Sequence, residues 1–119
     1  MTFNYKNVYL EDTSLIAGPY EAKGPLKKYF DKCYDDLYFG EDSWEKAESK
    51  IIKETVNMAI AKSELPASDI DYCFAGDLLN QCISSSFGLR DLNIPFLGIF
   101  GACSTFVEGL IMSSVFIDG

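Results

Sequence analysis

The C-terminal end of the chain carries a helix-length segment that is apolar on almost every side. From Cys103 to Ile117 the sequence reads CSTFVEGLIMSSVFI, and Glu108 is its only formal charge. A helix with one apolar stripe can lie on a surface, whereas a helix that is apolar all round must be covered on most sides. We therefore expect a buried helix sandwiched between other layers, as between two sheets.

A transmembrane span is the alternative for residues 94–117. This stretch of 24 residues with one charge is long enough to cross a bilayer. Against a span stand Glu108 near its middle, Pro95, and three glycines at 98, 101 and 109. The segment from Gly101 to Thr105 also suits a strand-to-helix turn better than a continuous helix, so we favour the buried helix.

Residues 43–63 give the clearest amphipathic pattern. Apolar side chains recur at steps of three and four on one face, and charged side chains, Glu48 among them, occupy the other. Asp42 or Ser43 can cap the first turn, and Pro66 marks the exit. The pattern predicts a helix with one face against the core.

The remaining segments predict short elements in alternation. Residues 70–75 and 95–100 are apolar runs typical of buried strands, and residues 80–92 fit a short helix. Residues 3–17 favour one or two short strands, and residues 26–39 fit a short helix face. This order of strands and helices predicts an α/β fold whose sheet is at least partly parallel.

Composition and charge restrict the partners. The chain has 119 residues, 48% of them apolar, which suffices for one folded domain. The formal net charge is −8, so we expect no nucleic-acid partner and no long-range attraction to an anionic membrane surface. A small anion is still compatible, because local dipoles can oppose the global charge.

The distribution of cysteine and histidine restricts the chemistry. None of the four cysteines forms a C-x-x-C pair, and we expect neither a metal site nor a cofactor. The chain contains no histidine, which excludes Cys-His and Ser-His-Asp catalysis from these residues alone. The opening MTFNYKNVYL lacks the pattern of a signal peptide, so we expect an intracellular protein with reduced thiols.

The segment FGACST places Cys103 where a strand passes into the C-terminal helix. The first N–H groups of a helix lack intrahelical partners, and the macrodipole adds positive potential there. A thiol at such a place can become a nucleophile, or the same donors can hold a carboxylate or phosphate oxygen. Ser104 and Thr105 add hydroxyl donors. The plainer interpretation, a small buried hydrophobe, suits Cys33, Cys73 and Cys82 well.

Asp77 is the second candidate site residue, followed in the same loop by Asn80 and Gln81. It comes directly after the strand 70–75, and ligands of α/β sheets bind beyond the carboxyl ends of strands. If that strand is parallel to the strand 95–100, both loops face one pocket. The alternative is a solvated loop aspartate with helix-capping neighbours.

Several motifs together resemble one family. DID-x-x-x-AGD-LLNQ, PFLGIFGACST, GPLKKYFDKCYDD and SWEKAES are similar to the stage V sporulation protein AD family, from Gly18 to about Ser114. That family belongs to the thiolase-fold superfamily, with the ketoacyl synthases. The resemblance implies a layered fold in which the cysteine-bearing helix is the central layer, within a mixed sheet. Because family members are much longer, residues 1–119 are expected to be a partial N-terminal thiolase-like domain without its second half.

The resemblance also implies a function. Family members are thought to bind dipicolinic acid during its uptake into the developing spore, together with other stage V sporulation proteins at the inner spore membrane. The chain is therefore expected in the forespore or spore, peripheral to that membrane, and as a homodimer or higher oligomer through exposed sheet edges. The expected ligand-binding residues, for dipicolinate or its calcium chelate, are Asp77, Asn80, Gln81, Cys103, Ser104 and Thr105.

Two other functions remain open from the sequence. In an acyl-condensing enzyme of the ketoacyl synthase or thiolase type, Cys103 would be the nucleophile, matching the position of that residue in condensing enzymes. The absence of histidine makes this the weaker interpretation, so we expect no enzyme activity. A structural role, as a dimerising scaffold that docks membrane partners, is the third possibility.

Overall fold

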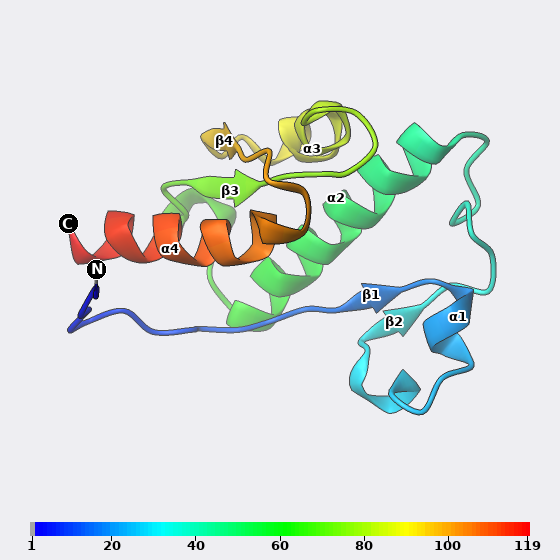
Figure 1. Ribbon diagram of the computed structural model, residues 1–119, viewed down its shortest axis with the longest axis horizontal. Helices are drawn as coiled ribbons and strands as arrows, with labels where there is room; N and C mark the ends of the chain where they lie inside the picture. The colour runs from blue at the N-terminus through cyan, green and yellow to red at the C-terminus, as the bar shows by residue number, and fades with distance from the viewer. Residues whose placement is uncertain (1) are drawn as a thin grey trace.

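The computed structural model describes residues 2–119 as an α/β arrangement (Figure 1). The α/β class predicted from the sequence is confirmed. Four short 3-10 turns, at Lys27–Tyr29, Ala67–Asp69, Arg90–Leu92 and Ala102–Ser104, connect the regular elements. The helices and strands, in chain order, are β1 (Ile16–Ala17), α1 (Pro19–Ala22), β2 (Lys32–Cys33), α2 (Trp44–Ser63), β3 (Cys73–Ala75), α3 (Ile83–Leu89), β4 (Phe96–Gly98) and α4 (Thr105–Asp118).

Helix α2 confirms the amphipathic prediction. Of the two candidate caps, Ser43 is the one used: its hydroxyl accepts a hydrogen bond from the N–H of Lys46 at 3.3 Å. Asp42 instead forms an ion pair with the side chain of Lys46 at 2.8 Å. The helix ends at Ser63, and Glu64, the next residue, adopts a left-handed conformation that closes the last turn.

Helix α3 packs on α2 through small side chains. Ser84 and Ser85 are completely buried, and Ala47 on α2 is only 2% exposed. A Cβ on Gly88 would lie 2.7 Å from the carbonyl oxygen of Ser49, so only glycine permits this approach. The close approach of α3 to α2 therefore depends on the absence of side-chain volume at Gly88, where Ile52 of α2 also lies in contact.

Strands β3 and β4 form a parallel pair, as the sequence predicts. Cys73 pairs with Phe96, and Ala75 pairs with Gly98. Helix α4 runs beside β3 (Figure 1). Because the two strands are parallel, the loops that follow them emerge at the same end, which brings the candidate site segments together.

Strands β1 and β2 form a second, separate parallel pair. The prediction of a mixed sheet is therefore wrong for residues 2–119, where both strand pairs are parallel. The helix predicted over residues 26–39 is also wrong. The Lys32 N–H bonds the Leu15 carbonyl and the Tyr34 N–H bonds the Ala17 carbonyl, so strand pairing prevails over a weak helical periodicity. Of residues 3–17, only Ile16–Ala17 form a strand.

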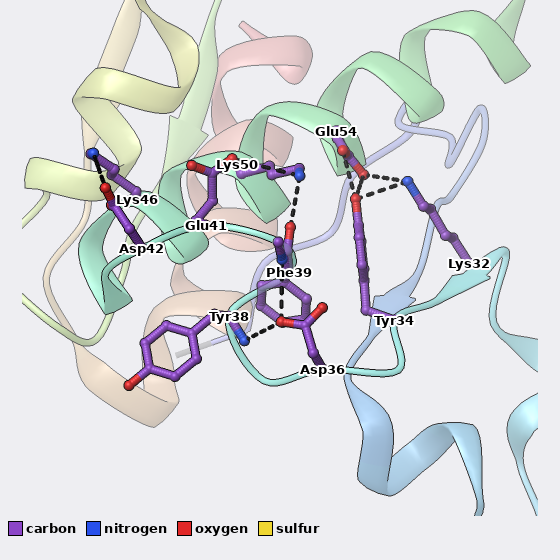
Figure 2. A network of polar contacts seen from close by, with 11 residues as sticks. Lys32, Tyr34, Asp36, Tyr38, Phe39, Glu41, Asp42, Lys46, Lys50 and Glu54 are labelled. Atoms are coloured by element: carbon purple, nitrogen blue, oxygen red, sulfur yellow. Dashed lines mark hydrogen bonds and ion pairs between the residues drawn. The ribbon is translucent and has the colours of Figure 1, made fainter.

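The N-terminal lobe, residues 16–42, is attached to α2 by polar contacts (Figure 2). The hydroxyl of Tyr34 donates to the carboxylate of Glu54 at 2.6 Å, and Lys32 forms an ion pair with the same carboxylate at 2.8 Å. Burial raises the pKa of Glu54, but the hydrogen bonds from Lys32 and Tyr34 outweigh it and hold that pKa below its ordinary value. Lys50 adds a bond to the carbonyl of Phe39 at 2.7 Å.

Helix α4 forms as predicted, but its predicted burial is wrong for these residues. None of its residues is buried, and Phe106 is 74% exposed. The reason is geometric: α4 packs on β3, and no second layer among residues 2–119 covers its other faces. Its exposed large apolar side chains are Phe106, Val107, Leu110, Ile111, Val115, Phe116 and Ile117.

The alternative of a transmembrane span over residues 94–117 is not what forms. The stretch divides into β4, the turn Ala102–Ser104 and α4, which has 14 residues. Within residues 2–119, every helix is too short or too polar to cross a bilayer.

The contact between α2 and α3 can be tested with a matched pair of glycine substitutions. Gly88→Ala should lower the free energy of unfolding by about 1–3 kcal/mol, because the new methyl group overlaps the α2 backbone. Gly109→Ala should raise it by about 0.5–1 kcal/mol, because a Cβ there has room, 3.7 Å from Ile99, and alanine favours a helix. Urea denaturation measures both. A Gly88→Ala variant as stable as the parent protein would contradict the packing described above.

Candidate functional site

The loop after β3 approaches the start of α4 through Gly76. A Cβ on Gly76 would collide with the carbonyl oxygen of Ile99 and lie 2.7 Å from the Thr105 methyl group. The Ile99 N–H also bonds the Ala75 carbonyl at 2.9 Å. Glycine at this position therefore lets the two loops predicted to share a pocket come into direct contact.

Asp77 is buried, with 5% of its surface exposed. One carboxylate oxygen accepts a hydrogen bond from the N–H of Cys82 at 3.0 Å, and the other accepts from the N–H of Ser85 at 2.8 Å. Asp77 thus caps the first turn of α3 across a loop of four residues. It is not solvated, and the structure directs its carboxylate toward α3.

The environment of Asp77 favours its charged form. Burial raises its pKa, but the N–H groups of Ser85 and Cys82 have the larger combined effect, so the pKa lies below the ordinary value of 3.8. The folded state therefore binds its proton less readily than the unfolded state. The resulting stabilisation is present above about pH 3.8 and is lost as the pH falls through the pKa of the folded state.

The turn before α4 is held by its own hydroxyl groups. Ser104 Oγ donates to the carbonyl of Gly101 at 2.7 Å, and Thr105 Oγ1 accepts from the N–H of Gly101 at 3.2 Å. Ala102 adopts a left-handed conformation with φ of +48°, which is strained for a residue with a side chain. Cys103 follows it and is exposed, and no side chain caps the N-terminus of α4.

Two adjoining hollows lie where these segments meet. The larger hollow, about 520 Å³, is lined by Cys103, Thr105, Gly109 and the end of β3. The smaller hollow, about 260 Å³, is lined by Asp77 and Leu78 on one side, by Ala102 and Thr105 on the other, and by Glu48 of α2. Thr105 borders both, so the structure brings the Asp77 and Cys103 loops to one place.

Two other predicted site residues lie outside both hollows. Asn80 and Gln81 are exposed and line neither hollow. The backbone carbonyl of Asn80 accepts the N–H of Ile83 at 3.0 Å, and Gln81 has a left-handed φ of +44°. Both residues belong to a tight turn that leads into α3. Their contact with a ligand stays a prediction.

Glu48 is a site residue that the sequence did not reveal. The amphipathic pattern placed it on the polar face of α2, yet it is only partly exposed and its Oε1 accepts the N–H of Leu78 at 3.1 Å. Its position, three and four residues before Ile51 and Ile52, is at the border of the apolar face. An acidic residue at the border between the apolar and polar faces of a helix is the sequence signal that could have identified Glu48.

Known proteins are similar in sequence to this chain over almost its whole length. The sequence model of the family described as Stage V sporulation protein AD matches residues 1–119. The chain belongs to this family. One curated relative, Stage V sporulation protein AD of Bacillus subtilis (strain 168), is 43% identical over 112 residues. The match covers 94% of this chain and 33% of the relative, so the chain spans about a third of that protein's length.

Family membership confirms the resemblance inferred from the AGDLLNQ and FGACST motifs. It also supports a role in sporulation and a spore-related location for this family member. Within residues 2–119, no group of three or more Cys, Asp or Glu side chains is arranged to hold a metal ion.

The capping role of Asp77 predicts a pH-dependent stability. Asp77→Ala should lower the free energy of unfolding by about 1.5–3 kcal/mol at neutral pH, because two backbone N–H groups lose a charged acceptor. The difference in unfolding free energy between the two proteins should narrow as the pH falls from about 3.8 toward the lower pKa of the folded state, because the unfolded chain binds a proton first. Urea denaturation at several pH values measures it. Asp71→Ala, at an exposed position, is the control and should change the free energy of unfolding by less than about 0.5 kcal/mol. Equal losses in the two variants would contradict the capping role of Asp77.

Proposed function

We propose that this chain forms part of a binding site for dipicolinic acid, or its calcium chelate, in a sporulation protein that acts in its uptake into the developing spore. The observation that carries the proposal is the N-terminus of α4. It has no side-chain cap and opens beside Cys103 and Thr105 onto the larger hollow. Helix N-termini hold carboxylate oxygens through backbone N–H groups and the macrodipole.

The polar groups around the hollows suit a flat aromatic acid. Phe74 and Phe106 line the larger hollow and offer apolar surface to a ring. The hydroxyl of Thr105, which accepts from Gly101, keeps its own proton for a carboxylate oxygen. A ring with carboxylates at its edge uses both kinds of surface.

The acidic residues nearby give a reason to include calcium. Glu48 and Asp77 line the smaller hollow, and a Cβ on Gly101 would lie 2.8 Å from a carboxylate oxygen of Glu108. These carboxylates repel a free dianion, whereas a calcium chelate carries less negative charge. The chelate is therefore expected to bind more tightly than the free acid.

The partners and placement of the whole protein form part of the same proposal. A thiolase-like layered fold, with residues 1–119 as a partial N-terminal domain, would cover α4 and explain its exposed apolar faces. Other stage V sporulation proteins at the inner spore membrane would be its partners, with this protein peripheral to that membrane. The exposed edges of the two short sheets suit a homodimer.

A second function, acyl condensation, is favoured by one observation. Cys103 is exposed at a strand-to-helix turn, directly after the left-handed Ala102, and α/β hydrolases also present their nucleophiles at strand-to-helix turns. The chain has no histidine, so a general base would have to come from elsewhere. In this reaction the Cys103 thiolate would attack an acyl thioester, forming an acyl-cysteine and releasing the thiol of coenzyme A.

Substitutions at Cys103 separate the two functions. Cys103→Ala should keep dipicolinate binding within about threefold, because backbone N–H groups hold the anion. Cys103→Asp should weaken it by more than about tenfold, because a carboxylate would face the ligand at close range. Isothermal titration calorimetry with dipicolinate, with and without calcium, measures both in the protein expressed from its own gene.

Val107→Asp is the matched control for Cys103→Asp. It adds the same charge to the first turn of α4 at a residue that is 56% exposed and lines neither hollow. It should bind like the parent protein. No heat from dipicolinate in either form would end the binding proposal. Mass spectrometry after incubation with an acyl-CoA tests the enzyme, and the absence of an adduct on Cys103 would end that alternative.

A further inference from the structure

Glu48 lies where α2 meets the two candidate loops. Its Oε1 accepts the N–H of Leu78, the residue that follows Asp77, at 3.1 Å. Its side chain lines the smaller hollow between the Asp77 loop and the Ala102–Thr105 turn. Glu48 is thus the residue of α2 that contacts the loop and borders the hollow at once.

The loop from Asp77 to Cys82 is held at different points by different elements. The carboxylate of Asp77 accepts the N–H groups of Cys82 and Ser85 at the start of α3. Within residues 2–119, the bond from Glu48 is the side-chain hydrogen bond that joins α2 to this loop. Asn80 and Gln81, which follow Leu78, are exposed and receive no comparable contact from α2. Their backbone is held on the C-terminal side, where the Asn80 carbonyl accepts the N–H of Ile83, and Leu78 is the point that fixes the loop on the N-terminal side.

The two lysines nearest to Glu48 along α2 pair with other groups, so the Glu48 carboxylate is available to accept the N–H of Leu78. Lys50, two residues further along α2, donates to the carbonyl of Phe39 at 2.7 Å and lies 3.5 Å from Glu41. Lys46, two residues before it, forms an ion pair with Asp42. Neither cation pairs with Glu48, and a carboxylate is a strong acceptor for a backbone N–H.

We propose that Glu48 is a positioning residue of the candidate site: it fixes the backbone of Leu78 against α2 and thereby holds the Asp77–Leu78 side of the smaller hollow opposite Thr105. The identity of the ligand rests on the function proposed above, whereas the placement of the loop does not. The role needs an acceptor oxygen at the end of the side chain and does not need a negative charge.

Three substitutions test the role. Glu48→Ala removes the acceptor, and Glu48→Met removes it while keeping the length of the side chain. Glu48→Gln keeps an amide oxygen that can accept the same N–H. Glu45→Ala, one turn earlier at an exposed position, is the control. The readouts are the hydrogen-exchange rate of the Leu78 amide by NMR and the affinity for calcium dipicolinate by calorimetry, in the protein expressed from its own gene.

The expected results form a pattern that a general loss of stability does not produce. Glu48→Ala and Glu48→Met should speed exchange at Leu78 by about tenfold and weaken the affinity by a similar factor. Glu48→Gln should restore both to within about threefold of the parent protein. Glu45→Ala should change neither. If Glu48→Ala does not fold, the methionine variant gives the same measurement with less loss of packing.

Three results would overturn the proposal, and a fourth would remove only the binding function. Unchanged exchange at Leu78 without the acceptor overturns it, and so does a glutamine variant that behaves like alanine, because charge would then be the requirement. Faster exchange with unchanged affinity also overturns it, because the loop would not contribute to binding. If the parent protein gives no heat with dipicolinate, the binding function fails, and the exchange rates alone decide whether Glu48 holds the loop.

Discussion

The buried carboxylate of Asp77 connects three parts of the structure. It sits at the end of β3, caps the first turn of α3, and so orients the helix that packs on α2 through Ser84 and Ser85. A carboxylate in this position is stable because backbone N–H groups replace the water it loses. Without it, two backbone N–H groups at the start of α3 would lose their charged acceptor.

At the candidate site, the side chains that hold the backbone in place are different from the groups that are free to contact a ligand. Both oxygens of Asp77 are committed to α3, and the hydroxyls of Ser104 and Thr105 bond the Gly101 turn. Cys103, which is exposed, and the first residues of α4 line the larger hollow. Several residues proposed as ligand contacts therefore use their polar atoms to hold backbone groups in place.

Local patterns in the sequence predicted much of the fold. The periodicity of residues 43–63 and the apolar runs at 70–75 and 95–100 gave α2, β3 and β4, because these elements have strong local signals. The helix expected over residues 26–39 failed, because pairing of β2 with the segment at Leu15 is a long-range effect. Glu48 was assigned to solvent for the same reason, since its partner Leu78 is 30 residues away.

The sequence by itself determined the α/β class, the family, and the two loops that carry Asp77 and Cys103, because motifs and periodicity are local properties of the chain. Only the tertiary structure decided that Gly76 lets those loops touch, that Asp77 turns its carboxylate to α3, and that Glu48 accepts the backbone N–H of Leu78. It also showed α4 exposed where its composition predicted burial. The apolar composition of a helix shows that its surface must be buried, whereas the elements that bury it come from other parts of the fold.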